Sequence, residues 1–147
     1  MSQNNNPGII LLVEDNADDI ELTLRAFKKS QLTSHIVIKR DGQEALDYLL
    51  DTDSSGYTNP LPTVTLLDLN MPRLNGLDVL KRLRSEERTS TMPIVILTTS
   101  DEQCDIVKSY RLGANSYIRK PVDTQEFFAA IQELEAFWTV RNVVPAA

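Results

Sequence analysis

The sequence predicts an α/β protein built around a doubly wound, five-stranded parallel sheet. Short apolar segments alternate five times with segments of helical periodicity, and most of the connections between them are brief. The apolar segment Val64–Leu67 shows no alternation of inward and outward positions, which is typical of a strand covered on both faces. These two observations favour a parallel sheet with helices on both sides.

The length and composition of the chain predict one domain. Its 147 residues, 41% of them hydrophobic, are enough for one buried core and too few for two ordinary domains. We expect a flexible polar arm over residues 1–8 and a single domain over residues 9–147, which ends in an extended helix and a tail.

Five segments are expected to form the strands. The list is Ile9–Val13, residues 36–38, Val64–Leu67, residues 94–97 and Ser116–Arg119. Their alternation with helices predicts right-handed crossovers and the flavodoxin-like strand order 2-1-3-4-5.

Five helices are expected between and after these strands. The first follows Val13 and carries Ala17, Ile20, Leu24 and Phe27 at helical spacing. The others are expected over Gly42–Leu50, from residue 75, over about residues 102–112 and over about residues 124–141. The helix that starts at residue 75 is expected to turn leucines inward and basic residues outward: Leu77, Leu80 and Leu83, and Lys81, Arg82 and Arg84.

Two further segments are candidates for interactions with other proteins. Residues 51–62 are rich in turn-forming residues and are expected to form a long surface loop. This loop is either an interaction site or an insertion without a function of its own. On the last helix Phe127, Ile131, Leu134 and Trp138 form the packing stripe, and Phe128 and Phe137 lie off it. This surplus apolar surface leads us to expect a homodimer through the last helix, although the C-terminal tail could also cover it.

The composition excludes several classes of protein. The formal net charge of -6, with no basic cluster, argues against a nucleic-acid binder. No apolar segment approaches the roughly 18 residues of a membrane-spanning helix, and the N-terminus lacks a secretion signal, so we expect a cytoplasmic protein that does not enter a membrane. Cys104 has no second cysteine to pair with and is interpreted as an ordinary helix thiol.

Acidic residues follow two of the predicted strands. Glu14 and Asp15 come directly after the first strand, and Asp68 comes directly after the third. Open α/β sheets bind ligands outside the carboxyl ends of their strands, so these acids are expected to converge on one crevice. Three like charges so close together need protonation or a cation, and an all-oxygen site favours Mg²⁺. Asp18 and Asp19, in contrast, are interpreted as first-turn acids that stabilise the helix dipole.

Two more strand ends contribute a hydroxyl and an ammonium group. Thr98 follows the fourth strand and Lys120 follows the fifth. With the acids, they suggest nucleophilic attack by Asp68 on phosphorus, while Thr98 and Lys120 hold the transferred group. No general base is evident, because His35 lies before the second strand, so the aspartyl phosphate is expected to persist as a signal.

This set of motifs resembles the receiver domain of two-component response regulators. The motifs are E-D after the first strand, L-L-D-L-N-M-P-R-L-N-G around the third, T-T-S after the fourth and K-P after the fifth, and the resemblance covers roughly residues 9–131. It implies that Asp68 is the phosphoacceptor and that Asp15 and Asp68 bind Mg²⁺ directly. It also implies that Glu14 acts through a metal-bound water and that Asn70 lends its backbone carbonyl.

The resemblance extends to the switch and to the partners. Thr98 and Lys120 would contact the phosphoryl oxygens, Tyr117 matches the rotameric switch residue, and Lys120-Pro121 matches the position of a cis peptide. The loop over residues 51–62 and the E-A-F-W sequence in the last helix look like the small response regulators that partner cyanobacterial phytochromes. This implies a stand-alone regulator with a histidine kinase of the phytochrome type as phosphodonor and an unknown protein downstream. Two departures are noted: Glu14 stands where many receivers have Asp, and Asn70 and Ser100 occupy positions that tune dephosphorylation.

Three alternative functions were compared with the receiver, and the sequence argues against the first two. An aspartate-nucleophile phosphatase resembles D-x-D at the nucleophile, whereas Asn70 stands at the second position here, so we expect no turnover of external substrates. A flavodoxin needs a phosphate-binding loop after the first strand, where E-D-N-A-D-D would repel a phosphate. The third alternative is an interaction module that kept the pocket but signals without phosphorylation.

Overall fold

The predicted parallel sheet is confirmed. The computed structural model describes residues 8–30 and 34–145, so the N-terminal arm predicted for residues 1–8 lies outside the described residues except for Gly8. Every pair of neighbouring strands in the five-stranded sheet is parallel, and the order β2-β1-β5-β6-β7 is the predicted order 2-1-3-4-5 once the strands of this sheet are counted along the chain. The five strands are β1 (Ile9–Val13), β2 (His35–Lys39), β5 (Val64–Leu67), β6 (Ile94–Thr98) and β7 (Ser116–Arg119).

Helices follow each of these strands. They are α1 (Ala17–Lys29), α2 (Gly42–Leu50), α3 (Gly76–Ser85), α4 (Gln103–Arg111) and α5 (Thr124–Ala136), with a 3-10 turn η2 (Glu87–Thr89) after α3 and a π-helical turn η3 (Phe137–Arg141) after α5. Four of the five α-helices begin at a residue whose side chain accepts a backbone N–H of the first turn: Asn16, Asp41, Asn75 and Asp123. These local caps explain why the predicted starts agree well with the observed ones.

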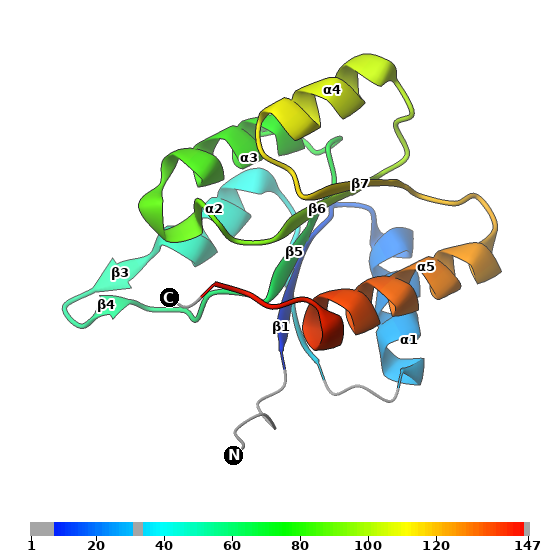
Figure 1. The fold of residues 1–147 in the computed structure, drawn as a ribbon, viewed down its shortest axis with the longest axis horizontal. Helices are drawn as coiled ribbons and strands as arrows, with labels where there is room; N and C mark the ends of the chain where they lie inside the picture. Colours follow the sequence, from blue (N-terminus) through cyan, green and yellow to red (C-terminus); the bar gives the residue numbers. More distant parts are fainter. Residues whose placement is uncertain (1–7, 31–33, 146–147) are drawn as a thin grey trace.

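The sheet separates two apolar layers. Leu11, Leu67 and Ile96 pack against α2 and α3 on one face. On the other face, Leu12 and Leu66 pack against α1 and α5. Figure 1 shows this arrangement, with α1 and α5 on one side of the strands and α2, α3 and α4 on the other. The central strands are thus buried on both faces, as their uninterrupted apolar sequences predict.

The segment predicted as a plain loop over residues 51–62 contains a small hairpin. Strands β3 (Thr52–Asp53) and β4 (Gly56–Tyr57) pair antiparallel and extend away from the body of the domain (Figure 1). Gly56 has a φ of 118°, and the Asp53 carboxylate accepts hydrogen bonds from the N–H and hydroxyl of Ser55. The turn residues that suggested a loop therefore form a reverse turn between two short strands.

Three expected orientations of helix residues are wrong, and the first is that of Ala17, which is exposed at the start of α1. Leu24 is 37% exposed, and the buried face of α1 consists of Ile20, Thr23, Ala26 and Phe27. The helical repeat places Thr23 and Leu24 at equal angles on either side of the line through Ile20 and Phe27, and the buried face of α1 is turned toward the side of Thr23 and Ala26.

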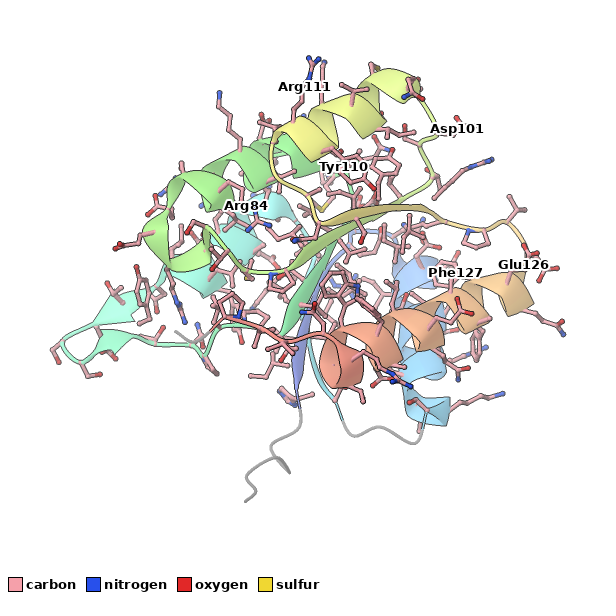
Figure 2. All side chains as sticks on the ribbon, viewed as in Figure 1. Arg84, Asp101, Tyr110, Arg111, Glu126 and Phe127 are labelled. Carbon is pink, nitrogen blue, oxygen red and sulfur yellow. The ribbon has the colours of Figure 1, made fainter. Side chains whose placement is uncertain are left out.

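Arg84 was expected to point outward but is partly buried. It points from α3 toward the segment that connects α4 with β7 (Figure 2), where its guanidinium donates to the carbonyl of Gly113 and to the side chain of Asn115, each at 2.9 Å. It also donates to the carbonyls of Thr89 (2.8 Å) and Ser90 (3.2 Å). Helical periodicity could not show this, because Gly113 and Asn115 are distant along the chain and Thr89 and Ser90 lie beyond the end of α3.

Within the described residues, no helix combines the length and apolar character needed to cross a bilayer.

Candidate functional site

The carboxyl ends of four neighbouring strands bring the predicted site residues to one edge of the sheet. Backbone hydrogen bonds continue past the strands: the N–H of Asp68 donates to the carbonyl of Val13 at 3.1 Å, and the N–H of Lys120 donates to that of Thr98 at 2.6 Å. The N–H of Glu14 donates to the carbonyl of Lys39 at 3.0 Å. The backbone of these residues is therefore held by the sheet itself, which places their side chains on rigid supports.

Three carboxylates meet at this edge. Glu14, Asp15 and Asp68 each offer an oxygen, and these oxygens lie within 4.8 Å of one another. Glu14 and Asp68 are buried, while Asp15 is exposed. The oxygen-only set, open to solvent on the side of Asp15, fits a hard divalent cation that keeps part of its water shell. The convergence predicted from the sequence is thus present in the structure.

Lys120 is the cationic centre of the site. Its buried ammonium group lies 2.5 Å from Glu14 Oε1, 2.7 Å from Asp19 Oδ2 and 3.6 Å from Asp68 Oδ2. Asp19 was assigned only to the helix dipole, so the sequence interpretation missed its contact with Lys120. One available signal was its spacing: four residues after Asp15, on the first turn of α1, it faces the same edge of the sheet.

Burial and pairing act in opposite directions on the two central ionisable groups. Burial, together with the negative charge of Asp68, raises the pKa of Glu14 from 4.5 to about 7, against the opposing effect of the hydrogen bond from Lys120. For Lys120, burial alone would lower the pKa, but the bonds to Asp19 and Glu14 outweigh it and the pKa is raised. Lys120 therefore remains a cation, while Glu14 exchanges its proton near neutral pH when no metal is bound.

Thr98 and Tyr117 both contact the loop that follows β6. Thr98 is completely buried, and its hydroxyl oxygen accepts a weak hydrogen bond of 3.4 Å from the N–H of Ser100. The hydroxyl of Tyr117, on the edge strand β7, donates to the carbonyl of Ser100 at 2.8 Å. Burial raises the pKa of Tyr117. Thr98, implied as a contact of the phosphoryl group, and Tyr117, implied as the switch residue, are thus linked through Ser100.

The expected cis peptide is not found. The described residues contain no cis peptide bond, so the bond between Lys120 and Pro121 is trans in this structure.

The loop between β5 and α3 packs tightly beside Asp68. The backbone N–H of Asn70, an exposed residue, lies 3.4 Å from Asp68 Oδ1. At Gly76 an added Cβ would lie 2.3 Å from the Asp68 carbonyl oxygen, so the close approach of α3 to the strand end requires glycine. Arg73, at a φ of 65°, forms an ion pair with Asp41, which fixes the loop against the start of α2.

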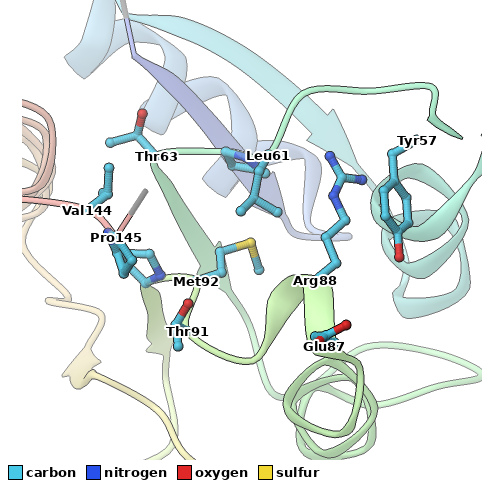
Figure 3. A pocket seen from close by; sticks show the side chains of 11 residues that line it. Tyr57, Leu61, Thr63, Glu87, Arg88, Thr91, Met92, Val144 and Pro145 are labelled. Atoms are coloured by element: carbon cyan, nitrogen blue, oxygen red, sulfur yellow. The ribbon is translucent and has the colours of Figure 1, made fainter. Parts of the chain in front are cut away.

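A hollow of about 660 Å³ lies at the N-terminal ends of β5 and β6, at the edge of the sheet opposite to the carboxylates. Its walls come from β4, η2, the segment leading into β6 and the C-terminal residues (Figure 3). Arg88 lies over the ring of Tyr57, at 4.1 Å from its centroid, and donates to the carbonyls of Leu49 and Asn59. Glu87 and Arg88 are the charged residues of the lining, and Arg88 is already engaged, so we locate the functional site at the carboxylates instead.

The fold and the site define a class of protein. A family model described as the response regulator receiver domain matches residues 10–132, and the chain belongs to this family. The motifs after the first, third, fourth and fifth strands of the sheet lie within this match, so the resemblance seen in the sequence is confirmed at the level of the family.

Particular relatives cover almost the whole chain. It is 36% identical over 146 residues to the response regulator Rcp1 of Synechocystis sp., which covers 99% of this chain and 98% of Rcp1. It is 38% identical over 139 residues to a probable methanogenesis regulatory protein, FilR2, of Methanothrix harundinacea, which covers 95% of this chain and 88% of FilR2.

Two solved structures share the fold closely. The Mn²⁺-bound form of Rcp1 matches with a TM-score of 0.86 and 34% identity, covering 95% of this chain and 100% of that one. The phosphorylated cyanobacterial phytochrome response regulator RcpA matches with a TM-score of 0.86 and 35% identity, covering 95% and 99%.

Proposed function

We propose that this receiver accepts a phosphoryl group on Asp68 from the phosphohistidine of a histidine kinase, with Mg²⁺ bound. The observation that carries the proposal is the meeting of Glu14, Asp15 and Asp68 beside the Lys120 ammonium. The likeness to a relative with bound Mn²⁺ and to a phosphorylated relative supports it. The alternative, an interaction module that is not phosphorylated, predicts the same fold and an inert Asp68.

The residues of the site have separate roles in the phosphoryl transfer. An oxygen of Asp68 attacks phosphorus as the bond from phosphorus to the donor imidazole nitrogen breaks, and the imidazole leaves with the electron pair. Glu14, Asp15, Asp68 and the carbonyl of Asn70 would hold Mg²⁺, which supplies positive charge to the phosphoryl oxygens. Lys120 presents a second positive charge, and Thr98 presents a hydroxyl to the same group.

The signal is proposed to leave the site through the loop after β6. Thr98 moves toward the new dianion, and because Tyr117 is bonded to the same loop at Ser100, it follows. This changes the surface formed by α4, β7 and α5, which acts on a downstream protein or on a second copy of the chain. We also propose that the chain turns over no external phosphomonoester, because Asn70 stands where aspartate-nucleophile phosphatases have their second Asp.

The kinase we propose is of the phytochrome type. RcpA, at 35% identity over nearly the full chain, is a phytochrome response regulator. Phosphotransfer from a panel of purified histidine kinases, with phytochrome and other sensors represented, tests this. A faster transfer from a kinase without a phytochrome sensor would contradict it.

Incubation with acetyl phosphate and Mg²⁺, followed by intact mass spectrometry, tests the central proposal. We expect an adduct of about 80 Da on the wild-type chain and none on Asp68→Asn, because the amide is not a nucleophile for phosphorus. Asp47→Asn, at an exposed position on α2, serves as the control and should be modified like the wild type. Absence of the adduct on the wild-type chain would refute the proposal that Asp68 is phosphorylated.

A further inference from the structure

Asp19 connects α1 to the site through Lys120. Its carboxylate accepts a hydrogen bond from the Lys120 ammonium at 2.7 Å, which is shorter than the 3.6 Å from that ammonium to Asp68. The Asp19 side chain is 25% exposed, whereas that of Lys120 is 5% exposed. The contact is therefore a charge-assisted bond at the mouth of the buried site.

The local structure of α1 leaves the Asp19 side chain available for this bond. Asp19 is the third residue of the helix, and its N–H donates to the Asn16 side chain at 2.9 Å. In a capping box, the side chain at this position would bond back to the N–H of the cap residue. Here Glu14 Oε2 takes the N–H of Asn16 at 3.1 Å, so Asp19 is free to face Lys120.

The position of the Asp19 backbone is also fixed. Its carbonyl accepts the Thr23 hydroxyl at 2.7 Å, and Thr23 is buried in the α1 interface. Both backbone polar groups of Asp19, its N–H and its carbonyl, are thus hydrogen-bonded, and its carboxylate is presented from a rigid helical turn.

The metal and the lysine need the same carboxylates. Both oxygens of Glu14 are engaged, one by Lys120 and the other by Asn16. A cation, or a water bound to it, that draws on Glu14 together with Asp15 and Asp68 therefore competes with Lys120 for the negative charge of this carboxylate. A buried ammonium without an anionic partner is costly, and Asp19, which is not part of the three-acid group, is the anion that remains beside it.

We infer that Asp19 is a positioning residue, which holds the Lys120 ammonium beside Asp68 while Glu14, Asp15 and Asp68 serve the cation. This inference rests on the proposed function. It predicts that without Asp19 the ammonium pairs more fully with Glu14 and Asp68, so that it competes with the cation and is misplaced for the incoming phosphoryl group.

The test compares Asp19→Asn with Asp18→Asn. Asp18 is an exposed neighbour in the same helical turn, so both variants lose one charge at the start of α1, but Asp19 is the one bonded to Lys120. Calorimetry without a phosphodonor gives the Mg²⁺ affinity, and acetyl phosphate with saturating Mg²⁺ gives the initial rate of phosphorylation. Thermal unfolding verifies that each variant is folded.

We expect Asp19→Asn to weaken Mg²⁺ binding and to slow phosphorylation, each by roughly tenfold, which is the size of one charge-assisted hydrogen bond. Asp18→Asn should remain within about twofold of the wild type in both measurements. Asp19→Ala compared with Asp18→Ala repeats the test with no amide left to accept a bond, and should give at least as large a difference.

Agreement of the Asp19 and Asp18 variants within about twofold in both measurements would overturn the positioning role and return Asp19 to a helix-dipole residue. A wild-type chain that is never phosphorylated would instead refute the proposed function, and the calorimetric comparison would still decide whether Asp19 controls the cation site.

Discussion

Glu14 is the residue whose ionisation most directly couples the site to pH. Its carboxyl group is almost fully buried, and burial raises its pKa to about 7 in the folded, metal-free protein, compared with 4.5 for the ordinary group. The folded state therefore binds a proton more tightly than the unfolded state. The resulting stabilisation is complete below about pH 4.5 and is lost as the pH rises through about 7.

We predict that the metal-free protein loses stability relative to Glu14→Gln as the pH rises from about 4.5 to above 7, by at most on the order of 3 kcal/mol. Urea unfolding of both proteins in the presence of a chelator, at a series of pH values, measures this difference. Because a cation prefers the deprotonated carboxylate, Mg²⁺ affinity should change in the opposite direction and increase through the same range. Parallel stability curves for the two proteins would contradict the prediction.

Asp19 and Arg84 show what a sequence reveals about single residues and what it does not. The carboxylates Glu14, Asp15 and Asp68 were predictable because each directly follows an apolar strand, and the topology of a parallel sheet brings such positions together. Asp19 and Arg84 lie on helix surfaces, where acids and bases are common. Their partners, Lys120 and Gly113, are distant along the chain, so only the folded structure identifies them.

At the scale of elements, Arg84 fastens α3 to the start of β7. Its guanidinium is partly buried, burial lowers its pKa, and its acceptors include three backbone carbonyls and the Asn115 side chain. We predict that Arg84→Met destabilises the protein by about 2–4 kcal/mol, because it removes a charged donor from all four acceptors. The Thr89 carbonyl and Asn115 Oδ1 keep the N–H groups of Met92 and Ile94 as donors, so the loss falls mainly on the carbonyls of Gly113 and Ser90. Urea unfolding measures the loss, and Lys81→Met, at an exposed position on the same helix, should change stability by less than about 0.5 kcal/mol.

Arg84→Lys provides a further check on the same element. A single ammonium group cannot reproduce the planar fork that reaches several acceptors, so we expect lysine to recover less than half of the loss. Full recovery of the free energy of unfolding by lysine would mean that the positive charge stabilises this contact and that the planar shape of the guanidinium does not.

The end of α5 carries an unusual buried acid. Glu135 is 1% exposed, and neither carboxylate oxygen has a hydrogen-bond partner among residues 8–30 and 34–145. An unpartnered polar group in a core costs free energy, and an apolar residue of similar size avoids this cost. Glu135→Met should therefore stabilise the protein by about 1–3 kcal/mol.

The matched control for this change is Glu133→Met, at an exposed position on the same helix. It should alter the free energy of unfolding by less than about 0.5 kcal/mol. Destabilisation by Glu135→Met in urea unfolding would show that the carboxylate has a favourable role in the folded protein.

At the scale of the whole molecule, the five-stranded fold was predictable from the sequence. The β3–β4 hairpin and the π-helical turn after α5 were not. Buried strands such as Val64–Leu67 have an unambiguous apolar pattern, and their order follows from the handedness of the crossovers. The β3–β4 hairpin has two-residue strands without a periodic signal, so residues 51–62 read as a loop. The last helix was expected to reach residue 141, but it changes at Phe137 to a wider π-helical turn that turn-by-turn periodicity does not reveal.

The homodimer through the last helix remains a prediction. The structure reduces the number of apolar side chains near this helix that are exposed enough to form the contact. Phe128 is partly buried against the core and lies under the Lys29 ammonium, so it offers little free area. Phe137 and Val140 are 50% and 61% exposed on the turn that follows α5. Two exposed apolar side chains on this one turn are suited to a contact with a second copy.

Sedimentation velocity at high micromolar concentration, with and without acetyl phosphate, tests this contact. We expect the wild type to sediment as a dimer in at least one of the two states, and Phe137→Asp to weaken association by at least roughly tenfold, because a carboxylate would be buried without a partner in the interface. Leu24→Asp places the same charge on α1, at a residue that is 37% exposed, and should leave the dimer intact. A wild-type chain that is monomeric in both states would exclude the dimer, and the surface formed by α4, β7 and α5 would then have to signal to a different protein.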